Sequence, residues 1–476
     1  MMNNWILRLV LFSLSFLLLC TSVVVQAQWE PEVRLTFNDS TSQTSLWNAW
    51  CVASSPAGDV HAVWYDDRDG NPEIYYKRST DYGARWGQDT RLTFDSHGSW
   101  HPSVAASDSN LHVVWYDNRD GNWEIYYKRS TDLGVNWGPD VRLTNDSALS
   151  NHPSLSSSGP WVYVVWVEQR DGNPEIYFKR SSNSGTSWSP DIRLSYALYV
   201  SWMPSIASSD TNVHVVWYDR RDGNFEVYDK RSTDAGTTWS ADLRMTYDTI
   251  ASTAPSVAIA WPVVHVAWTH DPTNNLQWKI YYQRSTDGGI TWCPQTTITG
   301  DSGFAQEPSL SVSGRNVHLV WRGGWVPYGN VVGYNHSTDE GISWSPDILL
   351  AGDTSLTLCP TVSASGPAVH VVWWSDRVGN REIFYKRNPT GNSGVEELSS
   401  SHLTHYLSRL TVSPNPFTTY TTVPGHSTDR FVLYDISGRR VGTYKGDRIG
   451  EGLRAGVYFI RAESGDARPV RVVKLR

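Results

Sequence analysis

Histidine, tryptophan and glutamate side chains stand just ahead of an apolar run that returns about every 50 residues. The run begins with Pro-Ser at 102–103 and again at 153–154. Tryptophan rings can stack on sugar rings, and histidine and glutamate can hydrogen-bond to hydroxyl groups, so these types favour a carbohydrate site. The alternative is that the rings only pack between neighbouring repeats. The candidate ligand-binding residues of this set are Trp47, Trp50, Trp100, His101, His152, Trp202 and Glu307.

A second set of candidates lies where the repeat breaks down, because a single ligand is expected where symmetry is lost. The two divergent segments read "THDPTNNLQWK" (269–279) and "RGGWVPYGNVV" (322–332). The candidates in them are His270, Asp271, Trp278, Trp325 and Tyr328. A binder with several equivalent sites would instead use the repeated turns, so binding stoichiometry separates the two models.

The repeated unit that must position these residues carries four short β-rich runs. In residues 91–144 they are "PSVAAS", "LHVVWYD", "EIYYKRS" and "DVRLT", each bounded by Gly, Asn, Asp, Ser or Pro. Such boundaries indicate strands joined by tight turns, and the array shows no helical period. Four strands in about 50 residues are typical of one blade of a β-propeller.

The number of blades follows from the second run, which occurs seven times, whereas a lone fourth run (33–37) precedes the first complete unit. We therefore expect an all-β chain with a seven-bladed β-propeller of four-stranded blades. The N-terminal strand would pair with 382–388 and close the ring, which leaves no exposed sheet edge at the seam.

An eight-residue box, first "STDYGARW" (79–86), occurs six times between the third and fourth runs. Its Ser and Asp can bond to nearby backbone, its Gly permits a positive φ, and its Trp can fold under the hairpin. The box resembles the Asp box, or BNR repeat, of the sialidase superfamily of propellers over about 29–390, with Asn183 departing in the third copy. This resemblance implies that the boxes lie opposite an active site.

The same resemblance raises the question of sialidase activity, which in that family uses three arginines, a Tyr nucleophile assisted by Glu, and an Asp acid/base. No Phe/Tyr-Arg-Ile-Pro segment precedes the first blade, and Arg34 lies in a "VRLT" setting that recurs in later units. Arg68 belongs to the repeated turn "RDGN", where we expect an Asp–Arg pair to brace each blade against the next. The catalytic residues stay unknown.

The turn "DDRDGNPE" (66–73) imitates part of a calcium loop with Asp67, Asp69, Asn71 and Glu73. The loop is short and blade six has lost it, so neither a metal nor a cofactor is predicted. A disulfide between Cys51 and Cys359 would lock the ring if both lie at its seam.

The two ends of the chain differ from the repeats. Residues 1–27 fit a secretory signal peptide, and no later run is long and apolar enough for a transmembrane segment. Without them, 39 Lys and Arg face 48 Asp and Glu, which argues against a nucleic-acid partner. We divide the remainder into a propeller (28–388), a linker (389–406) and a small Ig-like β-sandwich (407–476).

The C-terminal module (404–476) carries 12 Lys and Arg against 6 Asp and Glu, a balance opposite to that of the propeller. Its segments "SPNPF", "YDISGRRV", "GVYFIR" and "KLR" resemble the C-terminal sorting domain of the bacterial type IX secretion system. This resemblance implies export through the periplasm to the outer surface or the medium, with the type IX machinery as a partner.

These observations favour an exported bacterial propeller that binds glycan or glycoprotein without catalysis. The alternatives are an exo-α-sialidase-like glycoside hydrolase with a diverged site and a structural or adhesive surface protein. Convergent arginines beside a Tyr–Glu pair would favour the hydrolase, exposed tryptophans the binder, and a plugged, apolar channel mouth the scaffold.

Overall fold

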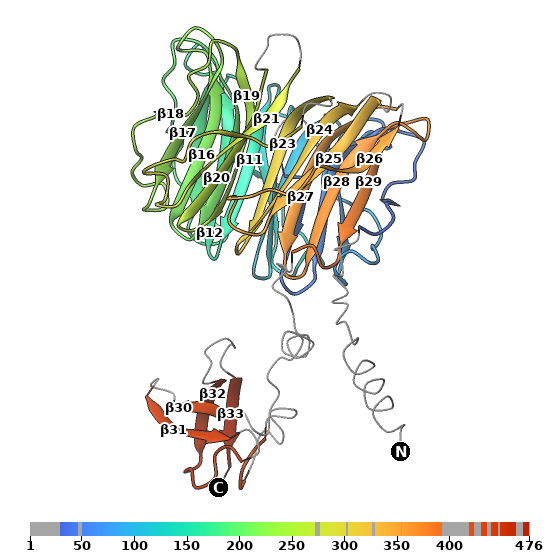
Figure 1. Ribbon diagram of the computed structural model, residues 1–476. Helices are drawn as coiled ribbons and strands as arrows, with labels where there is room; N and C mark the ends of the chain where they lie inside the picture. The colour runs from blue at the N-terminus through green and yellow to red at the C-terminus, as the bar shows by residue number, and fades with distance from the viewer. Residues whose placement is uncertain are drawn as a thin grey trace, which may run out of the picture. The chain divides into compact units, whose positions relative to one another are not determined.

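The computed structural model describes residues 29–45, 50–271, 277–300, 303–325, 329–353, 355–392, 418–422, 430–435, 439–445, 448–462 and 470–475. The chain divides into two compact units, 1–394 and 395–476, which are treated separately below. In the first unit, the described strands form seven antiparallel sheets, shown in Figure 1 from blue to orange along the chain. We number these sheets as blades 1 to 7.

The strands of the first four blades follow the repeat. Blade 1 contains β2 (Ser42–Gln43), β3 (Val52–Ser54), β4 (Val60–Asp66), β5 (Glu73–Ser79) and β6 (Thr90–Arg91). Blade 2 contains β7 (Ser99–Ser107), β8 (Asn110–Asp117), β9 (Glu124–Ser130) and β10 (Val141–Arg142). Blade 3 contains β11 (Ser150–Ser158), β12 (Trp161–Glu168), β13 (Glu175–Ser181) and β14 (Ile192–Arg193). Blade 4 contains β15 (Ser201–Ser209), β16 (Asn212–Asp219), β17 (Glu226–Ser232) and β18 (Leu243–Arg244).

The last three blades keep the order, with longer strands in blade 6. Blade 5 contains β19 (Ser252–Ala260), β20 (Val263–His270), β21 (Lys279–Ser285) and β22 (Thr296–Thr297). Blade 6 contains β23 (Gly303–Ser313), β24 (Asn316–Trp325), β25 (Gly329–Ser337) and β26 (Ile348–Asp353). Blade 7 contains β27 (Thr357–Ser365), β28 (Ala368–Ser375), β29 (Glu382–Asn388) and β1 (Val33–Arg34).

The second strand of each blade is buried on both sides because it lies in the middle of a blade packed between two others. Its "VVW" run supplies Val and Trp, which suit a pleated strand with both faces covered. Trp64, Trp115 and Trp217, for example, are fully buried. The core is therefore a set of layers between blades.

Ring closure is as the sequence predicted. β1 pairs antiparallel with β29 in the register Val33 with Tyr385 and Arg34 with Phe384. Arg34 also forms an ion pair of 2.7 Å with Glu382. The innermost strand β3 contacts β27 on one side and β7 on the other, so blades 7 and 1 are neighbours.

The eight-residue box forms the expected turn, but its tryptophan packs differently from the prediction. In the first copy, Ser79 Oγ donates to Asp81 Oδ1 (2.9 Å) and the Gly83 N–H donates to Ser79 Oγ (2.9 Å). The ring of Trp86 meets Tyr385 of the preceding blade edge-on, with centroids 4.9 Å apart. The box tryptophan thus joins two blades instead of folding under its own hairpin.

The arginine of the "RDGN" turn forms the predicted Asp–Arg pair, mostly within its own blade, and in blade 3 Arg170 also reaches Asp146, in the segment that joins blades 2 and 3, at 2.8 Å. Arg68 binds Asp66 at 2.5 Å and Asp89 at 2.7 Å. Asp66 ends β4 and Asp89 directly precedes β6, so the guanidinium ties inner and outer strands of blade 1 together. Its ring partner, Tyr75, belongs to the same blade.

The first unit extends past the boundary predicted at 388. Asn392 accepts from Asn316 through its main-chain oxygen at 2.5 Å, and its side-chain oxygen lies 3.3 Å from His318 Nε2. These two residues belong to blade 6, so 389–392 complete the packing of the propeller and are not linker. The rest of the predicted linker, like the predicted signal peptide, lies outside the described residues.

The second unit contains one antiparallel sheet in the order β31-β30-β32-β33. Its strands are β30 (Arg430–Asp435), β31 (Arg440–Lys445), β32 (Gly456–Ala462) and β33 (Val470–Lys474). Phe431, Leu433, Ile449, Ile460 and Val472 form its core. The other sheet of the predicted sandwich is not among the described residues. In the part of the chain that the structure describes, no helix has the length and apolarity to cross a bilayer.

Candidate functional site at the mouth of the ring

The predicted site residues are positioned by a bulge near the start of each innermost strand. In blade 2 the register shifts between Trp100 and Ser103, and His101 has a left-handed φ of 51°. The residues at the same place in blades 3 to 7 also have left-handed φ values; they are His152, Met203, Ala254, Glu307 and Cys359. Each precedes a proline. We call the end of the ring where these bulges lie the mouth.

An unbroken arc of rings occupies the mouth from blade 1 to blade 4. His101 lies 5.3 Å from Tyr65 and 5.3 Å from Tyr116, measured between ring centroids. It lies 6.0 Å from His152, which in turn meets Trp202 edge-on at 5.2 Å. Three of the predicted candidates are thus brought into contact, together with two tyrosines that the sequence analysis did not single out.

Trp100 lies beside this arc but is held by packing. Its ring meets Trp123 edge-on at 4.5 Å and stacks on Tyr116 at 6.2 Å. Trp123 was also missed, although the sequence signals it: "GNWE" at 121–124 replaces the "GNPE" of 70–73 and 172–175. Trp100 and Trp202 are both half-buried, so the arc is a packed wall with exposed edges and not a set of free rings.

Charged groups face the mouth from blade 6. Glu307 is 7% exposed, and its Oε1 accepts from Arg322 Nη1 at 3.2 Å, while its Oε2 is buried without a partner. Arg322 also lies over the ring of Phe304 at 5.9 Å. The strands β23, β24 and β25 that carry these residues are longer than their equivalents in other blades.

Burial sets the protonation of the mouth groups. It lowers the pKa of His101 to about 3, with a contribution from nearby His152, and lowers the pKa of His152 to about 4. Both imidazoles are therefore neutral at pH 7. Burial raises the pKa of Glu307 against the opposing effect of Arg322, and raises the pKa of the Cys359 thiol.

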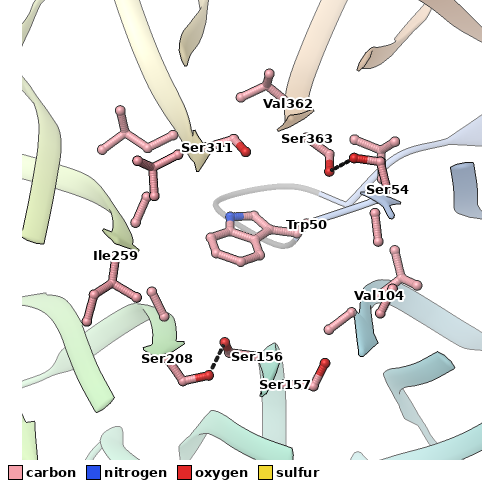
Figure 2. A pocket seen from close by; sticks show the side chains of 18 residues that line it. Trp50, Ser54, Val104, Ser156, Ser157, Ser208, Ile259, Ser311, Val362 and Ser363 are labelled. Atoms are coloured by element: carbon pink, nitrogen blue, oxygen red, sulfur yellow. Dashed lines mark hydrogen bonds between the residues drawn. The ribbon is translucent and has the colours of Figure 1, made fainter. Parts of the chain in front are cut away.

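Trp50 blocks the central channel just below the mouth, as Figure 2 shows. Blade 1 has an insertion between β2 and β3, which places this ring among the innermost strands of the other blades. The cavity that it lines measures about 180 Å³, below the roughly 300–1,000 Å³ usual for small-molecule sites. Apolar side chains and serines line the rest, and two serine pairs join blades: Ser54 with Ser363 (2.8 Å) and Ser156 with Ser208 (2.7 Å). The channel is plugged, but the mouth above it is aromatic and charged rather than apolar.

The remaining candidates do not join the arc. His270 is 5% exposed, lies 3.1 Å from Ser252 Oγ and packs edge-on against Tyr281, so it belongs to the interior of blade 5. Asp271 is also buried, and Trp278 is half-buried. Trp47, Tyr328 and the side chain of Trp325 lie outside the described residues.

The predicted disulfide is wrong, since Cys51 and Cys359 are both free and buried. Cys359 occupies the left-handed bulge position of its blade, equivalent to His101. Cys51 instead matches Ser103, because Ala53 pairs with His61 as Ala105 pairs with His112. The offset in register places the two thiols at different levels of neighbouring strands.

The four groups of the calcium-like turn are engaged by other partners. Asp67 accepts from the backbone and hydroxyl of Thr41, and Asn71 donates to Glu73 and to the Asp95 carbonyl. The carboxylates of Asp69 and Glu73 both pair with Arg91. Among the described residues, no group of three or more His, Cys, Asp or Glu is arranged to hold a metal.

The arginines of the outermost strands are likewise committed to ion pairs within their blades. Arg91 reaches Glu73 at 2.7 Å, and the equivalent Arg142 reaches Glu124 at 2.8 Å. Three arginines near the mouth have separate partners: Arg322 pairs with Glu307 at 3.2 Å, Arg381 lies over Trp374 at 4.8 Å, and Arg220 lies over Phe225 at 5.8 Å.

Comparison with known proteins gives a fold and no family. No family model and no curated protein matches the chain. The solved structure of the polysaccharide lyase Uly1 is 10% identical, with a TM-score of 0.53 over 76% of this chain and 100% of that one. An ulvan lyase bound to -[GlcA(1-4)Rha3S]- is 12% identical, with a TM-score of 0.51 over 73% of this chain and 94% of that one.

A sialidase of Trypanosoma rangeli, 12% identical, has a TM-score of only 0.44 over 75% of this chain and 59% of that one. At these identities the likeness concerns the fold alone. Over about three quarters of its length, this chain is similar in fold to the two polysaccharide lyases.

Proposed function

We propose that the propeller binds a polysaccharide at its mouth and does not cleave it. The observation that carries this proposal is the arc of Tyr65, His101, Tyr116, His152 and Trp202, whose rings contact one another in series. Because packing already fixes these rings, the protein loses little side-chain conformational entropy when a ligand binds to them. It offers apolar edges for sugar rings and polar ring atoms for their hydroxyls.

The Glu307–Arg322 pair gives the opposite side of the mouth a different character. Glu307 is buried and holds Arg322 by an ion pair of 3.2 Å, and the partly exposed guanidinium of Arg322 can meet a carboxylate or sulfate group. The ligand that fits both sides is a polysaccharide carrying acidic sugars. The saccharide bound to the ulvan lyase of similar fold contains such a sugar, GlcA.

Affinity electrophoresis in gels cast with alginate, pectate, ulvan or neutral xylan tests this proposal. Replacement Trp202→Ala removes the ring at one end of the arc and should weaken binding about tenfold or more, as expected when a large aromatic contact is lost. Trp161→Ala is the matched control, because Trp161 begins the second strand of blade 3, at the end of the ring away from the mouth. Equal retardation of both variants and the wild-type protein would refute binding at the mouth.

A second candidate function is β-eliminative cleavage of a uronate polysaccharide, favoured by the neutral His101 and His152 on either side of Tyr116. A neutral imidazole would take the C5 proton, the C4–O bond would break, and the Tyr116 hydroxyl would protonate the leaving oxygen. The products carry one new C4=C5 double bond and no water is consumed. Ultraviolet absorbance that grows with the wild-type protein, but not with Tyr116→Phe, would establish this function and displace the non-catalytic one.

We also propose that residues 404–476 direct the protein through the type IX system to the cell surface or the medium, after removal of residues 1–27. The segments "SPNPF" and "GVYFIR" and the basic balance of this module support the proposal. Deletion of 405–476 should leave the propeller inside the cell envelope. Unchanged export of the truncated chain would contradict it.

A further inference from the structure

Four blades present an exposed aromatic ring at one and the same place, just after the outermost strand. These rings, which we call the rim rings, are Phe37 (73% exposed), Phe94 (72%), Tyr196 (67%) and Tyr247 (71%). A single exposed aromatic residue needs no explanation, but the same position in four blades does. The outermost strand ends on the same side of the ring as the mouth, because Arg91 pairs with Tyr75 near the start of β5.

Each rim ring lies over an arginine that is itself fixed. The guanidinium-to-centroid distances are 4.8 Å for Arg34–Phe37, 4.9 Å for Arg91–Phe94, 4.5 Å for Arg193–Tyr196 and 4.7 Å for Arg244–Tyr247. In blade 1, Arg91 Nε donates to the Thr93 carbonyl at 2.7 Å and Nη2 donates to Glu73 at 2.7 Å. The ring is therefore held on one face by a cation, while most of its surface is open to solvent.

Blade 2 shows that the ring is not needed for the fold. There Asn145 stands in place of the aromatic residue and is exposed. Arg142 nevertheless donates to the Thr144 carbonyl at 2.8 Å and pairs with Glu124 at 2.8 Å, as its equivalents do. The turn is the same with and without the ring, so the four rings contribute surface rather than local structure.

The chain connects each rim ring to a mouth residue. The segment that begins at Phe94 leads to Trp100 and His101, and the segment that begins at Tyr196 leads to Trp202. Asn71 fixes the first of these segments by donating to the Asp95 carbonyl at 3.1 Å. The rim rings of blades 1, 3 and 4 thus flank the sector that carries the aromatic arc.

We propose that the rim rings are secondary binding sites for the same polysaccharide chain, which therefore must be long enough to run from mouth to rim. This inference extends the proposed function of the mouth. Polar residues directly follow Phe37, Phe94 and Tyr247, whereas Leu198 and Tyr199 near Tyr196 are also exposed. Isolated rings with polar neighbours suit sugar units with one apolar face and a margin of hydroxyls. A protein partner or a second copy of this chain would favour one continuous apolar patch.

The test replaces all four rim rings by the residue that blade 2 uses: F37N, F94N, Y196N and Y247N. Because Asn145 already occupies this position, thermal unfolding should be unchanged. Linked sites raise apparent affinity by about 10²–10⁴ without new contacts, so binding to the long polysaccharide retained best by the wild-type protein should fall at least about tenfold. Binding of a hexasaccharide cut from it, measured by calorimetry, should not change.

The outcomes separate this inference from the proposed function of the mouth. Loss of polymer binding in the rim variant with no loss in Trp202→Ala would support the rim sites and refute the mouth. Equal polymer binding by the rim variant and the wild-type protein would overturn the rim sites alone. Self-association of the wild-type protein that the rim variant lacks, with equal polymer binding, would assign the rings to protein contact and also overturn them. Retention on no polysaccharide would overturn both.

Discussion

The repeat places a histidine in the second strand of most blades, and this histidine should make stability depend on pH. In blade 2, His112 Nδ1 is hydrogen-bonded to the Tyr127 hydroxyl at 2.7 Å, and its Nε2 is buried without a partner. Burial, aided by nearby Arg129, lowers the pKa of His112 to about 3. The equivalent histidines His61, His265, His318 and His370 have similarly low pKa values.

The sign and size of the effect follow from linkage. An unfolded histidine titrates near pH 6.5, so below that pH the unfolded chain binds a proton that folded His112 refuses. The folded state is thus fully favoured above about pH 6.5 and loses stability as the pH falls, by about 1.4 kcal/mol per pH unit for one histidine. At about pH 5 the loss from His112 alone is about 2 kcal/mol, and it continues down to the folded pKa of about 3.

The replacement His112→Gln tests this reasoning, because glutamine keeps a polar partner for Tyr127 and cannot titrate. Urea unfolding at about pH 7.5 and about pH 5 should show a pH-dependent loss of free energy that is about 2 kcal/mol smaller in the variant. Tyr127→Phe is the control: it destabilises the protein at both pH values but retains the pH dependence, since burial is the main cause. The same loss in wild type and His112→Gln would refute a buried, neutral His112.

Two further predictions concern the seam and the thiols. Gly83→Ala should destabilise the protein by about 1–3 kcal/mol more than the control Gly70→Ala. Both glycines have positive φ, but only a Cβ added at Gly83 would clash, at 1.8 Å from the Tyr385 hydroxyl oxygen. Equal midpoints of urea unfolding for the two variants would contradict this packing of blade 1 on blade 7. Cys51 and Cys359 should react with a thiol reagent only in the unfolded protein, because both are buried and burial raises their pKa values. A melting temperature that falls when a reductant is added would show instead that the two cysteines are bonded.

Counting the repeats was enough to predict the seven-bladed propeller, because each blade has the same local sequence pattern. The continuous apolar run with Val and Trp in the second strand, together with the Gly-Asn turns, defined the strands. The lone run at 33–37 then required a partner, and the register of Val33 with Tyr385 supplies it. Closure of the ring could be predicted because a sheet edge with unpaired backbone groups is unfavourable, so the lone N-terminal strand was expected to pair with the last blade.

The details that failed depend on what lies across a blade interface, which the sequence of one repeat does not contain. The ring of Trp86 reaches Tyr385, a residue about 300 positions later in the chain. Trp50 was expected on the mouth, but an insertion in blade 1 carries it into the channel. Cys51 likewise lies two residues further along its strand than the position that Cys359 occupies in blade 7.

The bulge at the mouth separates what the repeat imposes from what each blade is free to choose. Residues at this position have φ between 49° and 56° in blades 2 to 7, a conformation that costs about 1–3 kcal/mol for a residue other than glycine. No glycine occurs there, and the side chains are all different in kind except for His101 and His152. A strained backbone retained with His, Met, Ala, Glu and Cys cannot owe its shape to any one side chain. The bulge therefore belongs to the architecture, whereas the choice of two histidines beside Tyr116, and of one glutamate beside Arg322, is where selection for a ligand can act.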